Sequence, residues 1–277
     1  QDTVGIAKLI VQTSNLIDNA EYDRANENID LIIQRSSASG YLLGTAEAYN
    51  LRGSIFSDQS NVKEALENFL QSISIYESVN NRPKMASLYN NIGLLYAEIK
   101  EYKVALANYF KAVQIYKAVN NKEFLGIIYN NIGTSYQRLG QTSSSGYYLK
   151  EAYKLNSSLH DTLRMAMTTH NIGTTFQAEG KCDSAMSYFK MSLRFLKKYS
   201  EGPGHIYNFT ELGACLLKEG KFKEAEEYLV RAFRISEETD QLSEREGICG
   251  YLAELYTKTN NYQKALQYKG LQLEIHD

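Results

Sequence analysis

The feature that most constrains this chain is a repeat of 40 residues that persists along its whole length. The string YNNIG occupies residues 89–93 and 129–133, and HNIG follows at residues 170–173. A fixed period of this length is typical of repeat proteins, in which each repeat packs only on its neighbours. A chain of 277 residues can therefore fold as one elongated array instead of two globular domains.

Three columns of residues recur in the repeats, two of them small and one apolar. Residues three and four apart lie on one face of a helix, so each column predicts a packed helix face. Glycine inside a helix costs about 0.5 to 1 kcal/mol relative to alanine, so its return in one column needs a packing reason. We infer two helices per repeat whose backbones approach closely. The first column holds Thr13, Gly53, Gly93, Gly133, Gly173, Gly213 and Ala253; the second holds Ala25, Ala65, Ala105, Ser145, Ala185, Ala225 and Ala265; the apolar one holds Leu16, Phe56, Tyr96, Tyr136, Phe176, Leu216 and Tyr256.

Turn residues and prolines set the helix boundaries in the same frame. The prolines Pro83 and Pro203 stand three periods apart, where each can open the first turn of a helix. Segments 141–146 and 201–204 are rich in weak helix formers or in Gly and Pro, and we expect flexible points there. The first helix of each repeat is predicted near 4–18, 44–58, 84–99, 124–139, 164–179, 204–219 and 244–259, and a second helix of similar length follows each.

The second helices open with an aromatic-x-x-Ala-Leu pattern, as in YKVAL at 102–106 and YQKAL at 262–266. With the small and apolar columns, this pattern resembles the tetratricopeptide repeat over essentially the whole chain. The period of 40 residues, longer than the common 34, resembles a long-helix subclass found in regulator and peptide-sensor proteins. The closing proline of the common repeat is absent. The resemblance implies an all-α fold, a right-handed superhelix (α-solenoid) of seven helix-turn-helix repeats. We expect a single array over residues 1–277, with repeats at about 4–43, 44–83, 84–123, 124–163, 164–203, 204–243 and 244–277.

The resemblance also implies a concave groove, lined by the first helices, that binds a peptide or protein ligand. Side chains that point away from the packed face would form its wall, and asparagines recur among them. An asparagine amide can bond the backbone of a bound peptide without reading its side chains. Alternatively, these amides bond the neighbouring repeat's helices and only set the stacking. The predicted groove residues are Asn50, Asn90, Asn130 and His170 in one column, Asn91, Asn131 and Asn171 in the next, together with Arg138 and Tyr207.

Charge along the same wall is graded from acidic to basic. Acidic residues come early and basic residues late, with Glu254 as an exception, which is compatible with a partner of bipolar charge or simply with a solvated helix face. The wall residues concerned are Asp18, Glu47, Asp58 and Glu98, then Arg138, Lys218 and Lys258.

Composition argues against several other function classes. The 30 Lys+Arg and 32 Asp+Glu leave a net charge of −2, so we expect no direct nucleic-acid partner. No apolar run approaches the roughly 18 to 20 residues of a membrane span. The four histidines show no HExxH spacing, and no phosphate-binding glycine loop is present. Cys182, Cys215 and Cys249 are read as free thiols. We therefore expect no catalytic residue, no metal and no cofactor.

These patterns favour a non-enzymatic protein- or peptide-binding module. An alternative is the sensory input domain of a larger signalling regulator, a histidine kinase or transcriptional regulator, whose effector part is absent from this chain. A small-molecule regulator would need a closed apolar pocket, and an enzyme ranks last. Homo-oligomerisation is left open. So is localisation, because a start at Gln1 without Met fits an exported protein whereas free cysteines fit the cytoplasm.

Overall fold

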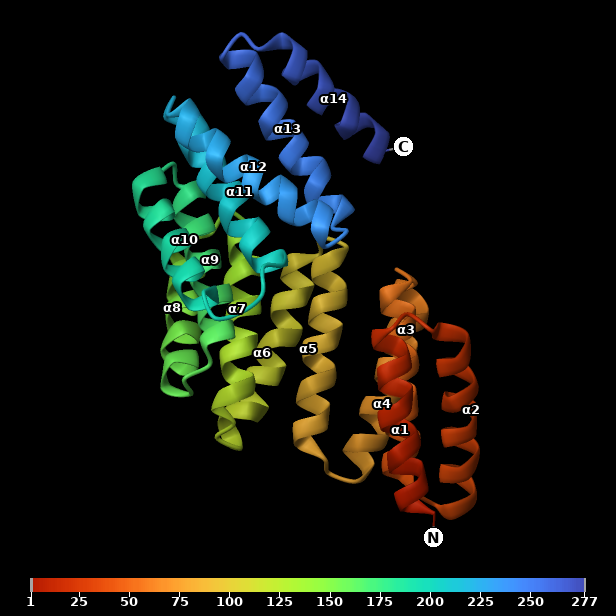
Figure 1. Ribbon diagram of the computed structural model, residues 1–277. Helices are drawn as coiled ribbons and strands as arrows, with labels where there is room; N and C mark the ends of the chain where they lie inside the picture. The colour runs from red at the N-terminus through yellow and green to blue at the C-terminus, as the bar shows by residue number, and fades with distance from the viewer. Residues whose placement is uncertain (1, 277) are drawn as a thin grey trace. The chain divides into compact units, whose positions relative to one another are not determined.

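The computed structural model describes residues 2–276, and in this range the chain folds entirely into helices joined by short turns (Figure 1). Consecutive helices lie side by side as antiparallel pairs, for example α5 with α6 and α13 with α14. The all-α architecture of helix-turn-helix repeats is thus confirmed, and the first helices begin and end within two residues of the predicted positions. The helices are α1 (Thr3–Asp18), α2 (Tyr22–Ser39), α3 (Leu42–Asp58), α4 (Val62–Ser78), α5 (Arg82–Glu98), α6 (Tyr102–Ala118), α7 (Lys122–Arg138), α8 (Thr142–Ser158), α9 (Thr162–Ala178), α10 (Cys182–Leu196), α11 (Pro203–Lys218), α12 (Phe222–Glu238), α13 (Leu242–Lys258) and α14 (Tyr262–His276).

The chain divides into two compact units, Gln1–Asn131 and Ile132–Asp277, and the boundary falls within α7. In the first unit, one core gathers around Ile6, Ile29 and Ile55, and a second around Phe69 and Tyr76. The second unit has a core that extends from α10 to α14 and includes the residues Phe189, Leu212, Leu229 and Leu252. That all seven repeats form one continuous array stays a prediction.

The glycine column has the packing role that its recurrence predicts. A Cβ placed on Gly53 would lie 2.6 Å from Cδ1 of Phe69, and one on Gly133 would lie 2.6 Å from Cγ of Leu149. Gly93, Gly173 and Gly213 likewise face a large side chain of the second helix in their own repeat: Tyr109, Phe189 and Leu229, respectively. Each glycine therefore provides the room in which a buried side chain of the paired helix packs. The second small column is buried at all seven positions.

The turns between helices follow one design at intervals of 20 residues. A residue with positive φ ends most helices, and the next residue's N–H bonds a carbonyl five residues back, as from Asn61 to Phe56 (2.8 Å) and from Glu101 to Tyr96 (2.8 Å). This is the Schellman closure of a helix C-terminus. The positive-φ residues are Ala20, Gly40, Ser60, Asn80, Lys100, Asn120, Gly140, His160, Gly180, Gly220, Asp240 and Asn260.

The series of turns is interrupted once, between α10 and α11. Here α10 ends at Leu196 and α11 begins at Pro203, a longer connection than any other in the described range. Glu201 in this connection forms ion pairs with Arg231 and with Arg234 (3.3 Å) of α12. The other segment of weak helix formers, residues 141–146, enters the regular helix α8. The flexibility expected at these two segments stays a prediction.

Two helical glycines of the second unit form a matched pair for testing the packing argument. Gly133→Ala should destabilise that unit by about 1 to 3 kcal/mol, because the new methyl group overlaps Leu149. Gly146→Ala should instead stabilise it by about 0.5 to 1 kcal/mol, because a Cβ there meets no atom within 4 Å. Urea unfolding followed by circular dichroism measures both changes. Equal effects of the two substitutions would contradict the packing role.

Candidate functional site

In the first unit, the predicted asparagines pair across consecutive repeats. The Nδ2 of Asn91 on α5 donates to Oδ1 of Asn50 on α3 (3.5 Å). One repeat later, the Nδ2 of Asn131 on α7 donates to Oδ1 of Asn90 on α5 (3.0 Å). All four side chains are half-buried, as is Asn130 beside them. The structure therefore brings the two predicted columns together as amide pairs, each of which joins one first helix to the next.

The pairing uses only part of the hydrogen-bonding capacity of the amides. Asn90 accepts through Oδ1, but its Nδ2 has no hydrogen-bond partner among the described residues. Asn50 differs, because its Nδ2 donates to Oε2 of Glu47 (3.4 Å). The bonds between repeats are of the kind that the stacking alternative requires, although they end on side-chain amides and not on helix carbonyls. Whether the amides also bind a ligand stays a prediction.

The acidic part of the wall is less uniform than the sequence indicates. Glu47 of α3 forms an ion pair with Lys84 of α5, so its charge is balanced across the repeat boundary. Asp58 and Glu98, at the ends of α3 and α5, form no ion pair among the described residues. Burial raises the pKa of Asp58, and repulsion from Asp18 adds to this although a hydrogen bond from Tyr22 opposes it. Burial and the charge of Asp58 likewise raise the pKa of Glu98. This edge of the first unit thus carries unbalanced negative charge.

In the second unit, His170 of α9 takes the place of the asparagine in a similar contact between repeats. Its Nδ1 lies 3.2 Å from Oδ1 of Asn208 on α11. The Nδ2 of Asn208 donates to Oγ of Ser192 (2.9 Å) and to the Gly204 carbonyl (2.7 Å). Since Oδ1 can only accept, Nδ1 of His170 is the donor in this buried network. Burial lowers the pKa of His170, because the charged imidazolium would lose its hydration, and the bond to Asn208 opposes this in part.

Tyr207 lies on the exposed face of α11 and contacts both neighbouring first helices. Its ring centroid is 6.0 Å from that of His170, and its hydroxyl donates to Oε1 of Glu244 on α13 (2.7 Å). Burial and this carboxylate raise the pKa of Tyr207 to about 12. Met167, which the sequence placed in the same column, is exposed on α9.

Two contacts in the second unit were missed by the sequence analysis. One is the Glu244 acceptor of Tyr207, and the other is a bond from Nε2 of Gln177 to Oε2 of Glu211 (2.7 Å) that links α9 to α11. Burial raises the pKa of Glu211. Glu211 occupies the column of Asn91, Asn131 and Asn171, so the period itself could have identified it. A carboxylate breaks the run of amides, and for this reason it was not recognised.

The remaining predicted residues have less defined surroundings. Arg138 is exposed in the last turn of α7, and Asn171 is half-buried on α9. The charge exception Glu254 is paired with Lys258 on the same helix (3.0 Å). The three cysteines are free and buried. Within residues 2–276, no three His, Cys, Asp or Glu side chains converge as a metal site would require, and no helix is long and apolar enough to span a bilayer.

The raised carboxyl pKa values predict that Asp58 destabilises the first unit at neutral pH. A folded protein that holds this proton more tightly than the unfolded chain gains stability as the pH falls toward the carboxyl pKa. Asp58→Asn should therefore raise the melting temperature at pH 7, and the gain should shrink as the pH is lowered to about 4. Glu27→Gln, which removes an exposed carboxylate on α2, is the control. A gain at pH 7 that is equal for both variants would refute the repulsion.

The lowered pKa of His170 predicts the opposite dependence for the second unit. Because the unfolded chain takes up this proton first, stability should fall as the pH drops below about 6.5, the ordinary histidine value. Titration of the His170 imidazole by NMR should give a midpoint below that value. A midpoint at or above it would contradict the buried network described here.

Comparison with known proteins identifies the fold. No curated protein matches the sequence. Among solved structures, the apo form of RapI aligns over 98% of this chain and 97% of its own, with a TM-score of 0.74 and 13% identity. NprR in complex with its cognate peptide NprX aligns over 98% of this chain and 79% of its own (TM-score 0.69, 16% identity). Aspartyl phosphate phosphatase F from Bacillus subtilis aligns over 90% and 75% (TM-score 0.67, 18% identity). At these identities the likeness concerns the fold alone.

The family is established by the sequence. Family models described as tetratricopeptide repeat match residues 44–118, 124–198 and 207–239, which is more than half of the chain. Their boundaries follow the helix pairs: the first match spans α3 to α6 and the second spans α7 to α10. The chain belongs to the tetratricopeptide repeat family.

Proposed function

We propose that this protein is a non-enzymatic binding module whose first-helix faces hold a peptide segment of a partner protein. The observation that carries the proposal is the state of the Asn90 amide. Its oxygen is fixed by Asn131 of the next repeat, while its two N–H donors have no partner among the described residues. An amide oriented in this way can donate to a peptide carbonyl without first reorganising, which reduces the entropic cost of binding.

The pairing between repeats supports a binding role as well as a stacking role. An inner-column amide whose carbonyl is held by its neighbour presents its N–H₂ group in a defined direction. The distance between the acceptor amides follows the repeat, so a bound chain would meet one donor group per repeat. Backbone recognition of this kind gives affinity with little demand on the sequence of the ligand.

The charges of the first unit indicate which peptides would bind there. Asp58 and Glu98 lack a cation among the described residues, and their raised pKa values reflect burial and repulsion within the row. A lysine or arginine of the ligand placed along this edge would relieve the repulsion. We therefore expect ligands with basic residues to bind the first unit more tightly than acidic ligands, and more so at low salt.

A second candidate is the sensory part of a larger signalling regulator. The observation in its favour is the fold likeness to NprR, whose structure contains its cognate peptide NprX and which aligns over nearly all of this chain. In that case the bound peptide would be the signal and not a docking partner. Both candidates use the same faces, and they differ in whether binding changes the activity of an attached effector.

The Asn90 amide can be tested by removing its donors while keeping its acceptor. Asn90→Asp retains an oxygen for the Asn131 bond but loses both N–H groups, so it should weaken peptide binding about fivefold to thirtyfold, the loss of one or two hydrogen bonds. The ligand would be the tightest binder from a random peptide array, measured by isothermal titration calorimetry on the 277-residue protein.

The control for this experiment makes the same chemical change elsewhere in the first unit. Asn68→Asp on α4 converts an exposed amide, whose Nδ2 donates to the Glu64 carbonyl (2.8 Å), to a carboxylate. Binding should be nearly unchanged. If no peptide binds saturably, or if both variants bind like the wild type, the proposed role of the first-helix faces is wrong.

A further inference from the structure

The last repeat exposes apolar side chains at positions that are buried in the interior repeats. Leu266 of α14 is 76% exposed, whereas Leu106, at the same position of an earlier repeat, is 7% exposed. Leu273 is 55% exposed, and the equivalent Val113 is 6% exposed. Tyr262 is also exposed, although its equivalent Cys182 is buried. Because the repeats share one geometry, these differences identify a face on which a covering element is missing.

The interior of the second unit shows what covers this face elsewhere. There the first helix of the following repeat packs on the preceding pair, α11 on α9 and α10, and α13 on α11 and α12. Tyr256 of α13 donates to Oε1 of Glu226 (2.6 Å), and Glu226 occupies the position equivalent to Leu266. Asn208 of α11 donates to Oγ of Ser192, which is equivalent to Gln272. An amphipathic helix is therefore the natural occupant of this kind of surface.

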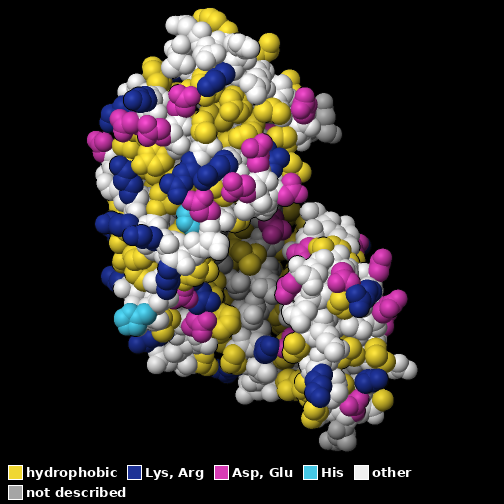
Figure 2. Space-filling view, in the orientation of Figure 1, with side chains coloured by type: hydrophobic (Ala, Val, Ile, Leu, Met, Phe, Trp, Pro, Cys, Tyr) yellow, Lys and Arg dark blue, Asp and Glu magenta, His cyan; other side chains and the backbone are white. Residues whose placement is uncertain are grey.

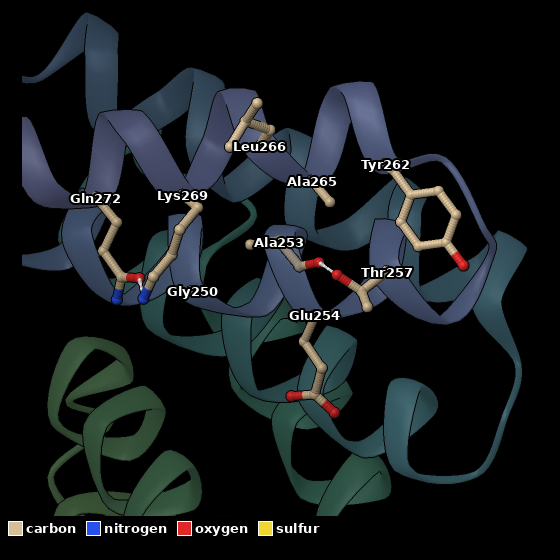
Figure 3. A pocket seen from close by; sticks show the side chains of 9 residues that line it. All are labelled: Gly250, Ala253, Glu254, Thr257, Tyr262, Ala265, Leu266, Lys269 and Gln272. Carbon is tan, nitrogen blue, oxygen red and sulfur yellow. Dashed lines mark hydrogen bonds between the residues drawn. The ribbon is translucent and has the colours of Figure 1, made fainter.

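A hollow of about 590 Å³ lies between α13 and α14 and is open to solvent (Figure 3). Tyr262 and Thr257 lie at one end, and Lys269 and Gln272 at the other, where Nζ of Lys269 donates to Oε1 of Gln272 (2.9 Å). Leu266 borders the hollow between these ends. Figure 2 shows apolar side chains gathered over the part of the second unit where Figure 1 draws these helices. The surface thus has an apolar stretch and one polar end.

The first helix of the chain shows that the repeat can also have a polar outer face. Lys8 is exposed where the following repeats hold the buried Ala48 and Leu88, and Asn15 is exposed where they hold the buried Ile55 and Leu95. Substitution of this kind makes the outer face of a repeat compatible with water. The α13–α14 face lacks such substitutions at Leu266 and Leu273, and it therefore has the character of an interface.

We propose that the α13–α14 face docks an amphipathic helix of a separate protein partner, seated as the first helix of a following repeat would be. The helix α11 defines the side chains that such a partner needs. Asn208, Leu212 and Cys215, spaced four and three residues apart, are its buried residues toward the preceding pair. The partner accordingly carries an amide or carboxylate opposite Gln272 and Lys269. Apolar residues four and seven positions later lie opposite Leu266 and Tyr262.

A peptide with the sequence of residues 203–218 tests this proposal directly. Held helical by a side-chain lactam and labelled with a fluorophore, it is titrated with the 277-residue protein and followed by fluorescence anisotropy. Saturable binding with one peptide per chain is expected. Leu266→Asp combined with Leu273→Asp should weaken it at least tenfold, and a peptide carrying Leu212→Asp should bind equally poorly. Both substituted leucines are exposed, so the protein should remain folded, which circular dichroism verifies.

A matched control places the same charges on the other unit. Val4→Asp combined with Val11→Asp changes two exposed apolar residues of α1 and should leave peptide binding unchanged. Absence of saturable binding, or an equal loss in both double variants, would overturn the proposal. Sedimentation of the protein alone addresses the remaining occupant: self-association that Leu266→Asp abolishes would assign the face to a second copy of this chain and overturn the separate partner.

Discussion

The contact on which the rest of the structure depends is the close approach of the two helices in each repeat. A large side chain of the second helix packs on a glycine of the first, as Phe189 does on Gly173 and Leu229 on Gly213. Any side chain at the glycine would separate the pair and move every residue of the first helix that contacts the next repeat. This constraint explains why the glycine returns at one position although it weakens the helix by itself.

Contacts between repeats then determine the properties of the proposed binding faces. The same column that pairs Asn131 with Asn90 in the first unit holds Glu211, bonded to Gln177, in the second. Each of these bonds fixes one polar group of a first helix and leaves others available. Stacking and ligand binding are therefore not exclusive roles for these residues. A side chain held by its neighbour is already ordered, and an ordered donor binds with a smaller loss of entropy.

The repeat also provides an internal standard for surfaces. An exposed leucine is unremarkable on most proteins, but Leu266 and Leu273 can be compared with equivalent residues in the same chain. The comparison shows that their exposure arises from the missing neighbour and not from the local helix. Lys269 and Gln272 replace residues that are apolar or small in other repeats, so the face has both an apolar and a polar part. A surface of this composition is suited to a helix and not to a small ligand.

The sequence by itself determined the helix pairs, their boundaries and the packing column, because a period of 40 residues repeats one local pattern and local patterns specify helices. It also located the polar columns, since helical spacing assigns Asn50, Asn90 and Tyr207 to one side of their helices. Only the tertiary structure decided which of these groups are bonded to one another. The partners of Asn90, His170 and Tyr207 are about 40 residues away in the chain, and a hydrogen bond depends on atomic positions that no local pattern fixes. For the same reason, the exposed α13–α14 face became visible only when each repeat could be compared with its neighbours in space.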